Sequence, residues 1–194
     1  MRKSFLTIAF LVAGLAAAGA QDWKVDATHS RVMFTVTHML ISEVTGRFTA
    51  FDVLLKQGKE DFAGSSVEAT IKTASVTTDN DTRDKHLRSD DFFNAEKYPA
   101  ITFTSTSFEK TGDDTYRIKG NLMIRDVTKE VTLDGKMLGT VTDPRGNTRV
   151  GFRATATINR FDYGVKWDRT LDRGGLVVSN DVTITITTEL VKQQ

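Results

Sequence analysis

The segment from Arg83 to Phe103 reads RDKHLRSDDFFNAEKYPAITF and is the densest mixture of ionisable and apolar side chains in the sequence. Within it His86 stands among Asp84, Asp90 and Asp91, a combination that could support general acid and base catalysis. Three carboxylates on a short polar helix more often face water or cap the helix N-terminus. The segment therefore indicates either an active site or a lid over a binding site.

Other patterns of catalytic and metal-binding residues are weak. The sequence contains no cysteine, so disulfides and thiolate metal sites are excluded. It has no GxSxG elbow and no glycine-rich phosphate loop. His29, His38 and His86 are the only histidines, and they fall on separate expected elements rather than at the compact spacing of a zinc motif. We therefore expect no catalytic residue, no metal and no cofactor.

The elements that would position these residues are strands. Apolar and polar side chains alternate through Phe152–Arg160 and again through Val182–Leu190, the period-two pattern of a strand with one wet face. Similar spacing predicts about eight antiparallel strands in all. The remaining six are Arg31–His38, Arg47–Leu55, Ser66–Thr73, Ala100–Phe108, Thr115–Ile124 and Glu130–Leu138. One short helical segment is expected near residues 82–96, ending before Pro99.

The N-terminus has the pattern of a cleavable signal peptide. Arg2 and Lys3 precede an apolar run, and Ala18-Gly19-Ala20 has the small-x-small form of a cleavage site. We expect residues 1–20 to be removed, leaving 21–194 as one periplasmic domain with no stable membrane anchor. Those first residues hold two basic side chains and no acidic one, so the mature chain has 24 basic against 25 acidic residues. That balance does not suggest a nucleic-acid partner.

An antiparallel sheet with one apolar face must hide that face, and curling into an eight-stranded barrel achieves this. The inward residues then either fill a solid core or line a cavity for one small ligand, and the pattern alone leaves both open. Alanines at 154 and 156 leave room, which suits a hydrocarbon chain. The candidate ligand-binding residues on the strands are Phe34, Val36, His38, Phe48, Ile71, Ile101, Phe103, Leu122, Phe152, Ala154, Ala156, Ile158 and Ile184.

Three further candidates lie where such a cavity would open. Phe92 and Phe93 are expected to close the mouth of the barrel. Arg160, if it keeps the inward phase of Ile158, would be a buried charge that needs a partner, such as a nearby aspartate. An ion pair of this kind is favoured over a contact between Arg83, Arg88 or Arg160 and the polar head of a ligand.

Four separated motifs, in order, resemble the YceI-like family of secreted lipid-binding proteins, over nearly all of residues 22–191. They are His29–His38 with Gly46–Phe48, Thr82–Phe93 with Tyr98–Phe103, Lys119–Lys129, and Gly151–Gly164. The resemblance implies an all-β, extended lipocalin-like barrel whose interior holds a polyisoprenoid or a similar long-chain amphiphile, such as a quinone or an isoprenyl phosphate. Asp126 departs from the glycine usual in the family, and aspartate tolerates turn geometry.

The sequence thus predicts a periplasmic carrier whose partner is an isoprenoid-type lipid, and a homodimer is compatible with it. Two alternatives remain open at this point. One is an enzyme that acts on such a lipid through His86 and the nearby aspartates. The other is a ligand-free barrel that binds a protein partner. The identity of the lipid, its donor and its acceptor do not follow from the sequence.

Overall fold

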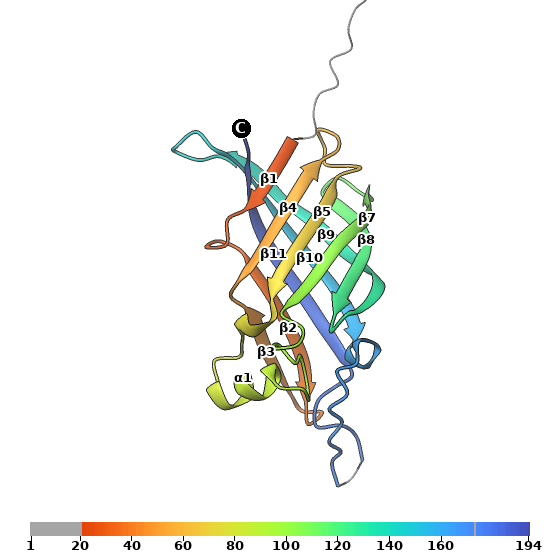
Figure 1. Cartoon of the computed structure of the whole chain (residues 1–194). Coiled ribbons are helices and arrows are strands. Elements are labelled where there is room, and N and C mark those ends of the chain that lie inside the picture. The colour runs from red at the N-terminus through yellow and green to blue at the C-terminus, as the bar shows by residue number, and fades with distance from the viewer. Residues whose placement is uncertain (1–20, 173) are drawn as a thin grey trace, which may run out of the picture.

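A computed structural model describes residues 21–172 and 174–194, so the expected signal peptide lies outside the described residues. The fold is almost entirely antiparallel sheet with one α-helix (Figure 1). Within the described residues, no helix is long and apolar enough to cross a membrane. The elements are β1 (Gln21–Val25), β2 (Arg31–His38), β3 (Ser42–Phe48), β4 (Phe51–Gln57), β5 (Ser66–Lys72), η1 (Thr73–Ser75), β6 (Val76–Thr77), α1 (Asp81–Arg88), β7 (Ala100–Lys110), β8 (Thr115–Ile124), β9 (Val127–Thr142), β10 (Thr148–Asn159), η2 (Arg160–Tyr163) and β11 (Asp181–Lys192).

Eight strands close the barrel in the order β1, β4, β5, β7, β8, β9, β10 and β11, and β11 pairs again with β1. Strands β2, β3 and β6 prolong this wall at the lower end in Figure 1, because β2 pairs with the other half of β11. Because β1 and β11 pair with each other, the first and last strands of the described wall do not present free edges along that pairing. The predicted all-β, extended lipocalin-like antiparallel barrel is confirmed.

Some of the predicted strands are wrong in their extent: β9 is longer than the predicted Glu130–Leu138, and β1 was not among the eight predicted strands. The segment Arg47–Leu55 is two strands, β3 and β4, because the chain leaves the ladder at Thr49 and Ala50. There Thr49 and Ala50 bond instead to Ser75, whose own segment is the short helix η1 between β5 and β6. The interruptions lie on adjacent strands, so the wall changes direction at one level of the barrel.

The helical segment is shorter than expected. The side chain of Asn80 accepts a hydrogen bond from the backbone N–H of Arg83 and caps α1 at its start. The helix ends at Arg88, where the backbone N–H of Ser89 turns back to the carbonyl of His86. Residues 89–98 are turns rather than the continuation predicted to residue 96, and Asn94 has a φ of +46° that a helix does not allow.

An aromatic cluster fills the upper end of the barrel, which we call the sealed end. Trp23 of β1 lies 5.5 Å from Phe62, and Phe62 lies 5.3 Å from Phe152, measured between ring centroids. Tyr116 and Phe108 extend the cluster to β8 and β7. These rings are buried, so the barrel is solid at this level. The opposite end, formed by α1, the β2–β3 turn and residues 164–172 and 174–180, is called the mouth end.

Candidate functional site

Below the aromatic cluster the barrel encloses a cavity of about 380 Å³ whose wall is almost wholly apolar. This size falls in the range of small-molecule sites. Its lining comes from nearly every strand, from α1 and from the segment between η2 and β11. All the predicted inward residues lie on this wall: Phe34, Val36, His38, Phe48, Ile71, Phe92, Phe93, Ile101, Phe103, Leu122, Phe152, Ala154, Ala156, Ile158, Arg160 and Ile184. The packed-core alternative is therefore disfavoured by the structure, while the binding role of these residues stays a prediction.

Small residues shape the cavity beside the aromatic ones. Phe34 on β2 stands opposite Gly46 on β3, and a Cβ atom at Gly46 would lie 2.3 Å from the Phe34 ring. Glycine at position 46 therefore lets the ring lie against the wall. The ring of Phe93 enters from the turns after α1 and meets Phe48 at 5.7 Å and Phe34 at 6.4 Å. The lower part of the cavity is consequently bounded by three aromatic rings.

The mouth is covered by an aromatic contact between two segments distant in sequence. Phe92 is buried, and its ring lies 5.0 Å from the imidazole of His86 and 5.5 Å from the indole of Trp167. Trp167, in the segment between η2 and β11, also meets His86 at 5.7 Å. The sequence placed Phe92 and Phe93 near the mouth, but it gave no signal for Trp167, which follows no alternating pattern.

The cluster of His86 and aspartates does not form one site. Asp84 is buried, contrary to the expectation that it faces water, and it accepts hydrogen bonds from the hydroxyls of Thr77 and Thr78 and from the Thr78 backbone N–H. Burial alone would raise the pKa of Asp84, but these hydrogen bonds outweigh it and hold the pKa below its ordinary value. Asp84 fastens α1 to the strand before it.

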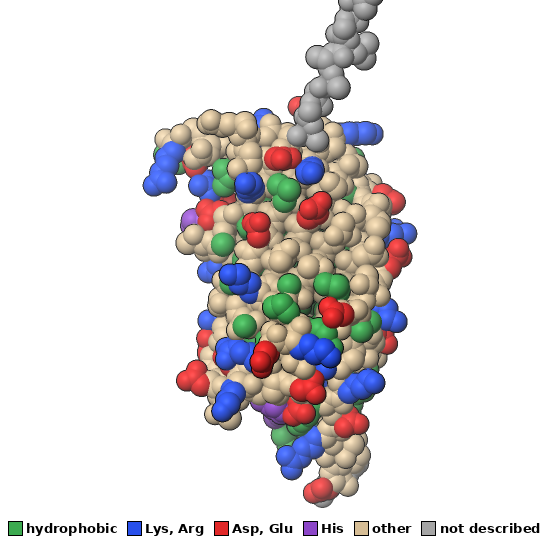
Figure 2. Space-filling view, viewed as in Figure 1, with side chains coloured by type: hydrophobic (Ala, Val, Ile, Leu, Met, Phe, Trp, Pro, Cys, Tyr) green, Lys and Arg blue, Asp and Glu red, His purple; other side chains and the backbone are tan. Residues whose placement is uncertain are grey.

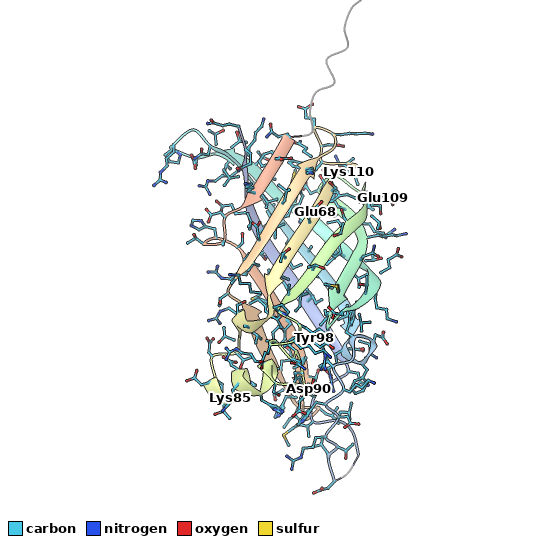
Figure 3. All side chains as sticks on the ribbon, in the orientation of Figure 1. Glu68, Lys85, Asp90, Tyr98, Glu109 and Lys110 are labelled. Atoms are coloured by element: carbon cyan, nitrogen blue, oxygen red, sulfur yellow. The ribbon has the colours of Figure 1, made fainter. Side chains whose placement is uncertain are left out.

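The other two aspartates have separate roles. Asp90 pairs with Arg125 at 3.0 Å, and Arg125 lies over the ring of Tyr98. These contacts tie the turns after α1 to the β8–β9 turn, near the labelled Asp90 and Tyr98 in Figure 3. Asp91 alone contacts His86, with 2.7 Å between Oδ2 and Nε2, and both side chains are substantially exposed. Of the four residues, only His86 lines the cavity.

Arg160 is buried, with 5% of its surface exposed, and it lines the cavity. Its predicted carboxylate partner is wrong. The guanidinium donates to three backbone carbonyls instead, those of Ser179, Val165 and Val178. Burial lowers its pKa, and Asp168 opposes that shift. The alternating strand ends at Asn159, so Arg160 starts the short helix η2 and reaches carbonyls of the following segment.

The remaining polar groups of the lining gather at the same end. His38 forms a β-bridge to Val178, next to the Arg160 guanidinium. Tyr163 of η2 is buried, and its hydroxyl has no hydrogen-bond partner among the described residues. Burial raises the pKa of Tyr163 to about 12. Arg83 lines the cavity while donating to the Thr78 hydroxyl and carbonyl. Polar chemistry is thus concentrated near the mouth.

Arg88 is the one predicted head-group candidate that the cavity does not include. Its guanidinium donates to the carbonyls of Ala74 and Val76, which anchors the end of α1 to the wall. The three arginines that the sequence singled out are all bonded to backbone carbonyls in the structure, and Arg83 and Arg160 face the cavity as well. Arg88 is therefore a structural residue in this arrangement.

Among the described residues, the one group of side chains with metal-ligand spacing contains a single histidine, His29. His29 groups with Asp26 and Glu189 at the sealed end, with side-chain ligand atoms within 4.8 Å of one another. The guanidinium of Arg149 occupies this group, donating to Asp26 at 2.8 Å and to Glu189 at 2.5 Å. Arg149 also bonds Asp143 at 2.8 Å. The cluster is a clasp in which Arg149 and His29 bond carboxylate oxygens, rather than an arrangement that leaves these oxygens free for a cation.

Several lining residues were missed because strand boundaries or phase were misjudged. The break at Thr49 and Ala50 gives β4 its own inward set, including Leu55. A bulge between Ser105 and Ser107 shifts the phase of β7, so Phe108 also faces inward. The other missed residues are Met33, Val44, Val53, Thr78, Leu87, Val131, Leu133, Gly135, Arg153, Tyr163, Val165, Trp167, Val177, Val178, Thr188 and Leu190.

Both the sequence and the structure of this chain are similar to those of known proteins. The family model described as "YceI-like domain" matches residues 23–190. Protein YceI of Escherichia coli O17:K52:H18 is 43% identical over 172 residues, which are 87% of this chain and 90% of that protein. The crystal structure of the Campylobacter jejuni YceI protein is 32% identical with a TM-score of 0.72, covering 81% of this chain and 90% of that one.

A third solved structure shares the fold at low sequence identity. It is a polyisoprenoid binding domain from Saccharophagus degradans, 18% identical with a TM-score of 0.64, and it covers 88% of this chain and 98% of that domain. At this identity the likeness supports the fold alone. The barrel fold is therefore the common feature of these proteins and of the present chain.

Proposed function

Since the chain belongs to the YceI-like family, we propose that it is a periplasmic carrier that holds a polyisoprenoid or a similar long-chain amphiphile inside its barrel. The single observation that carries the proposal is the cavity, which is apolar over nearly all its wall and has polar side chains only toward the mouth end and at isolated points elsewhere. An amphiphile with a long hydrocarbon tail matches this distribution. The solved domain of this fold from Saccharophagus degradans is described as polyisoprenoid binding, and we extend that class of ligand to this chain as part of the proposal.

The binding mechanism we propose is burial of apolar surface. Each CH₂ group moved from water into such an interior contributes about 0.8 kcal/mol, so a long tail binds without many polar contacts. The tail would lie between Phe103, Ala154 and Ala156, above the ring of Phe93. The sealed end stops the tail at the aromatic cluster.

The polar head of the ligand would lie at the mouth end. The Arg160 guanidinium has five N–H groups, and three of them are used by carbonyls. It has no carboxylate partner among the described residues, so its positive charge is available to a quinone oxygen or a phosphate. His38 lies beside it through Val178. These residues give the cavity a direction, with the tail inward and the head toward solvent.

The periplasmic location is part of the proposal and rests on the sequence of residues 1–20. A basic start, an apolar run and the Ala18-Gly19-Ala20 site are typical of an exported protein. A carrier is needed where an apolar molecule must cross an aqueous compartment. Fractionation of the source cells, followed by mass measurement of the mature N-terminus, tests this part directly: a mature chain that begins at Gln21 is expected.

The central test is native mass spectrometry of protein purified from its own host, followed by solvent extraction. A bound lipid with an isoprenoid tail is expected. If the protein carries no lipid and calorimetry detects no binding of ubiquinone or isoprenyl phosphates, the carrier proposal is wrong. A lipid converted to product, with conversion lost in a His86→Ala variant, would instead favour the enzyme alternative.

A pair of substitutions on β10 checks that binding uses the cavity. Ala156 lines the cavity, and its neighbour Thr157 is exposed on the outer face. Ala156→Trp should fill the space and reduce the amount of co-purified lipid several-fold, while Thr157→Trp should leave it unchanged. Equal losses in the two variants would mean that the lipid binds elsewhere. Melting temperatures of both variants control for loss of folding.

A further inference from the structure

The turn between β2 and β3 presents three consecutive apolar side chains to solvent. Met39, Leu40 and Ile41 are 42%, 67% and 86% exposed. Among the described residues, the only other large hydrophobic side chains this exposed are Leu138 and Val141, both on β9. We call residues 39–41 the apolar tip. Isolated exposed hydrophobic residues need no explanation, but a consecutive run at a projecting turn is unusual.

The backbone of the apolar tip is strained. Met39 has a φ of +51° and Leu40 a φ of +65°, in the left-handed region that glycine or asparagine occupies most easily. Glycine or asparagine would adopt these backbone angles with less strain and would expose less apolar surface to water. The chain instead carries long apolar side chains there, a combination that neither turn geometry nor solubility favours.

The apolar tip borders the mouth of the cavity. The backbone N–H of Met39 donates to the carbonyl of Val177 at 2.8 Å, and the preceding residue, His38, pairs with Val178. His38, Val177 and Val178 all line the cavity. The side chain of Leu40 lies against Gly175, where a Cβ atom would be 3.1 Å from Leu40 Cδ1. The tip and the segment between η2 and β11 therefore form one edge of the mouth.

We propose that the apolar tip inserts into the surface of a phospholipid bilayer and places the mouth of the barrel against the membrane. This inference rests on the proposed function, because an isoprenoid-type ligand is stored in a bilayer and must reach the cavity from there. An apolar edge inserted at the mouth lets the tail pass between two apolar environments with little exposure to water.

A bilayer fits the apolar tip better than a second copy of the chain does. Three side chains on a narrow turn supply far less than the ~1,200 Å² that a stable protein interface buries. In Figure 1 the β2–β3 turn lies at the lower end of the barrel, beside the segment between η2 and β11, whose described residues extend further down. Charged side chains of both signs surround the hydrophobic ones at this end, among them Lys85 and Asp90 (Figures 2 and 3). Insertion of apolar side chains, rather than attraction to anionic lipid, is therefore the expected source of binding.

The test is flotation of the full-length mature protein with phosphatidylcholine vesicles, with and without added phosphatidylglycerol. The variant Leu40→Asn/Ile41→Asn should lose at least about tenfold in vesicle affinity, since two inserted apolar side chains are replaced by polar ones. The matched control Leu138→Thr/Val141→Thr removes two exposed apolar side chains from β9 and should keep wild-type affinity. Equal binding by wild type and the tip variant, or binding that requires phosphatidylglycerol, would overturn the proposal.

A second variant gives a direct signal. Ile41 is the most exposed of the three, so Ile41→Trp should fold normally, and its added fluorescence should shift to the blue and be quenched by brominated phosphatidylcholine. An unshifted, unquenched signal contradicts insertion. A sedimentation run at the same concentration checks the alternative occupant: dimerisation that is lost in the tip variant would identify the tip as a contact between copies.

The two proposals can fail separately. Binding of ubiquinone presented in dilute solution measures the cavity alone, and the tip variant should bind it as tightly as wild type. Transfer of ubiquinone from phosphatidylcholine vesicles measures the mouth at the membrane, and the tip variant should be about tenfold slower. If neither wild type nor the tip variant binds ubiquinone or any other isoprenoid, the proposed function is wrong. Membrane docking is then decided by the vesicle-binding experiment alone. Equal transfer rates would overturn the docking inference alone.

Discussion

The two ends of the barrel are built from different interactions. At the sealed end, Trp23, Phe62 and Phe152 pack ring against ring. There Arg149 also joins three carboxylates, two of them beside β1 and β11 and the third in the β9–β10 turn. At the mouth end the chain is held by hydrogen bonds to backbone carbonyls, as at Arg160, by a few aromatic contacts, and by mostly exposed ion pairs such as that of Asp90 with Arg125. The apolar tip is exposed there as well.

The difference indicates that one end of the barrel stabilises the fold and the opposite end gives a ligand access to the cavity. The sealed end has buried aromatic side chains and paired charges, so opening it would expose much apolar surface. The mouth has partly buried rings on segments without long strand pairing, so it can open locally at a smaller free-energy cost. A ligand is therefore expected to enter and leave past α1 and Trp167.

The largest effect is expected from removing an aromatic side chain at the sealed end. Trp23 is 3% exposed and donates its indole N–H to Gln57 at 3.0 Å. Trp23→Ala should lower the free energy of unfolding by about 3–5 kcal/mol, through lost apolar burial and the cavity left behind. Urea titration followed by circular dichroism measures it. A loss below about 1 kcal/mol would mean that this end is not the stabilising part of the barrel.

The Arg149 clasp should give the sealed end a distinctive response to acid. Hydrogen bonds from His29 and Arg149 hold the pKa of Asp26 well below its usual range, and Arg149 does the same for Asp143. Because these pKa values are depressed in the folded state, their stabilisation is present above the unfolded value of about 3.9 and is lost as the pH falls below it.

Arg149→Met removes the cation and should lower stability at pH 7, by less than Trp23→Ala does. The difference in unfolding free energy between wild type and variant should shrink as the pH falls below about 4, where both aspartates become protonated in the unfolded chain. Thermal unfolding between pH 2.5 and pH 7 measures this. A difference that stays constant across that range would show that Arg149 stabilises the fold only through packing of its aliphatic part.

The sequence predicted the regular part of the barrel well and its interruptions poorly. Strict alternation in Phe152–Ile158 fixes which side chains face inward, and the structure places all of those expected on the cavity wall. Alternation cannot reveal that the ladder stops at Thr49 and Ala50, because those residues suit a strand as well as a break. Nor does it reveal the bulge at Ser105–Ser107, which changes the phase without changing composition.

The mouth was the least predictable region for a different reason. Its contacts join segments far apart in the chain, such as His86 with Trp167, and no local period encodes them. The partner of Arg160 was mispredicted because backbone carbonyls, which every residue carries, replaced the aspartate that was expected. The arrangement of side chains at the mouth depends on tertiary contacts, whereas the alternation along a strand can be recognised in the local sequence.

Substitution of an aromatic residue at the mouth should have a smaller effect on stability and a larger effect on the rate of ligand release. Trp167 is partly buried and contacts Phe92 and His86. Trp167→Ala removes both contacts and should cost about 1–2 kcal/mol of global stability, less than Trp23→Ala does. Each aromatic contact is worth about 0.5–1.5 kcal/mol, so release of ligand should become up to about tenfold faster. Stopped-flow displacement of a dansyl-labelled isoprenoid measures this. Unchanged release would place the exit elsewhere.

The smallest effect should have the opposite sign. Leu40 has a φ of +65°, a conformation that costs about 1–2 kcal/mol for most residues and less for asparagine. Leu40→Asn should therefore stabilise the free protein by about 0.5–1 kcal/mol, because the exposed leucine makes few compensating contacts. Urea titration measures the gain, with Leu138→Asn on β9 as a control without a strained backbone. A stabilised variant that also transfers ubiquinone from vesicles more slowly would show that the mouth gives up stability for access to the membrane. A destabilised one would mean that Leu40 packs on Gly175 to hold the mouth together, and the contrast between the two ends would be smaller than the structure indicates.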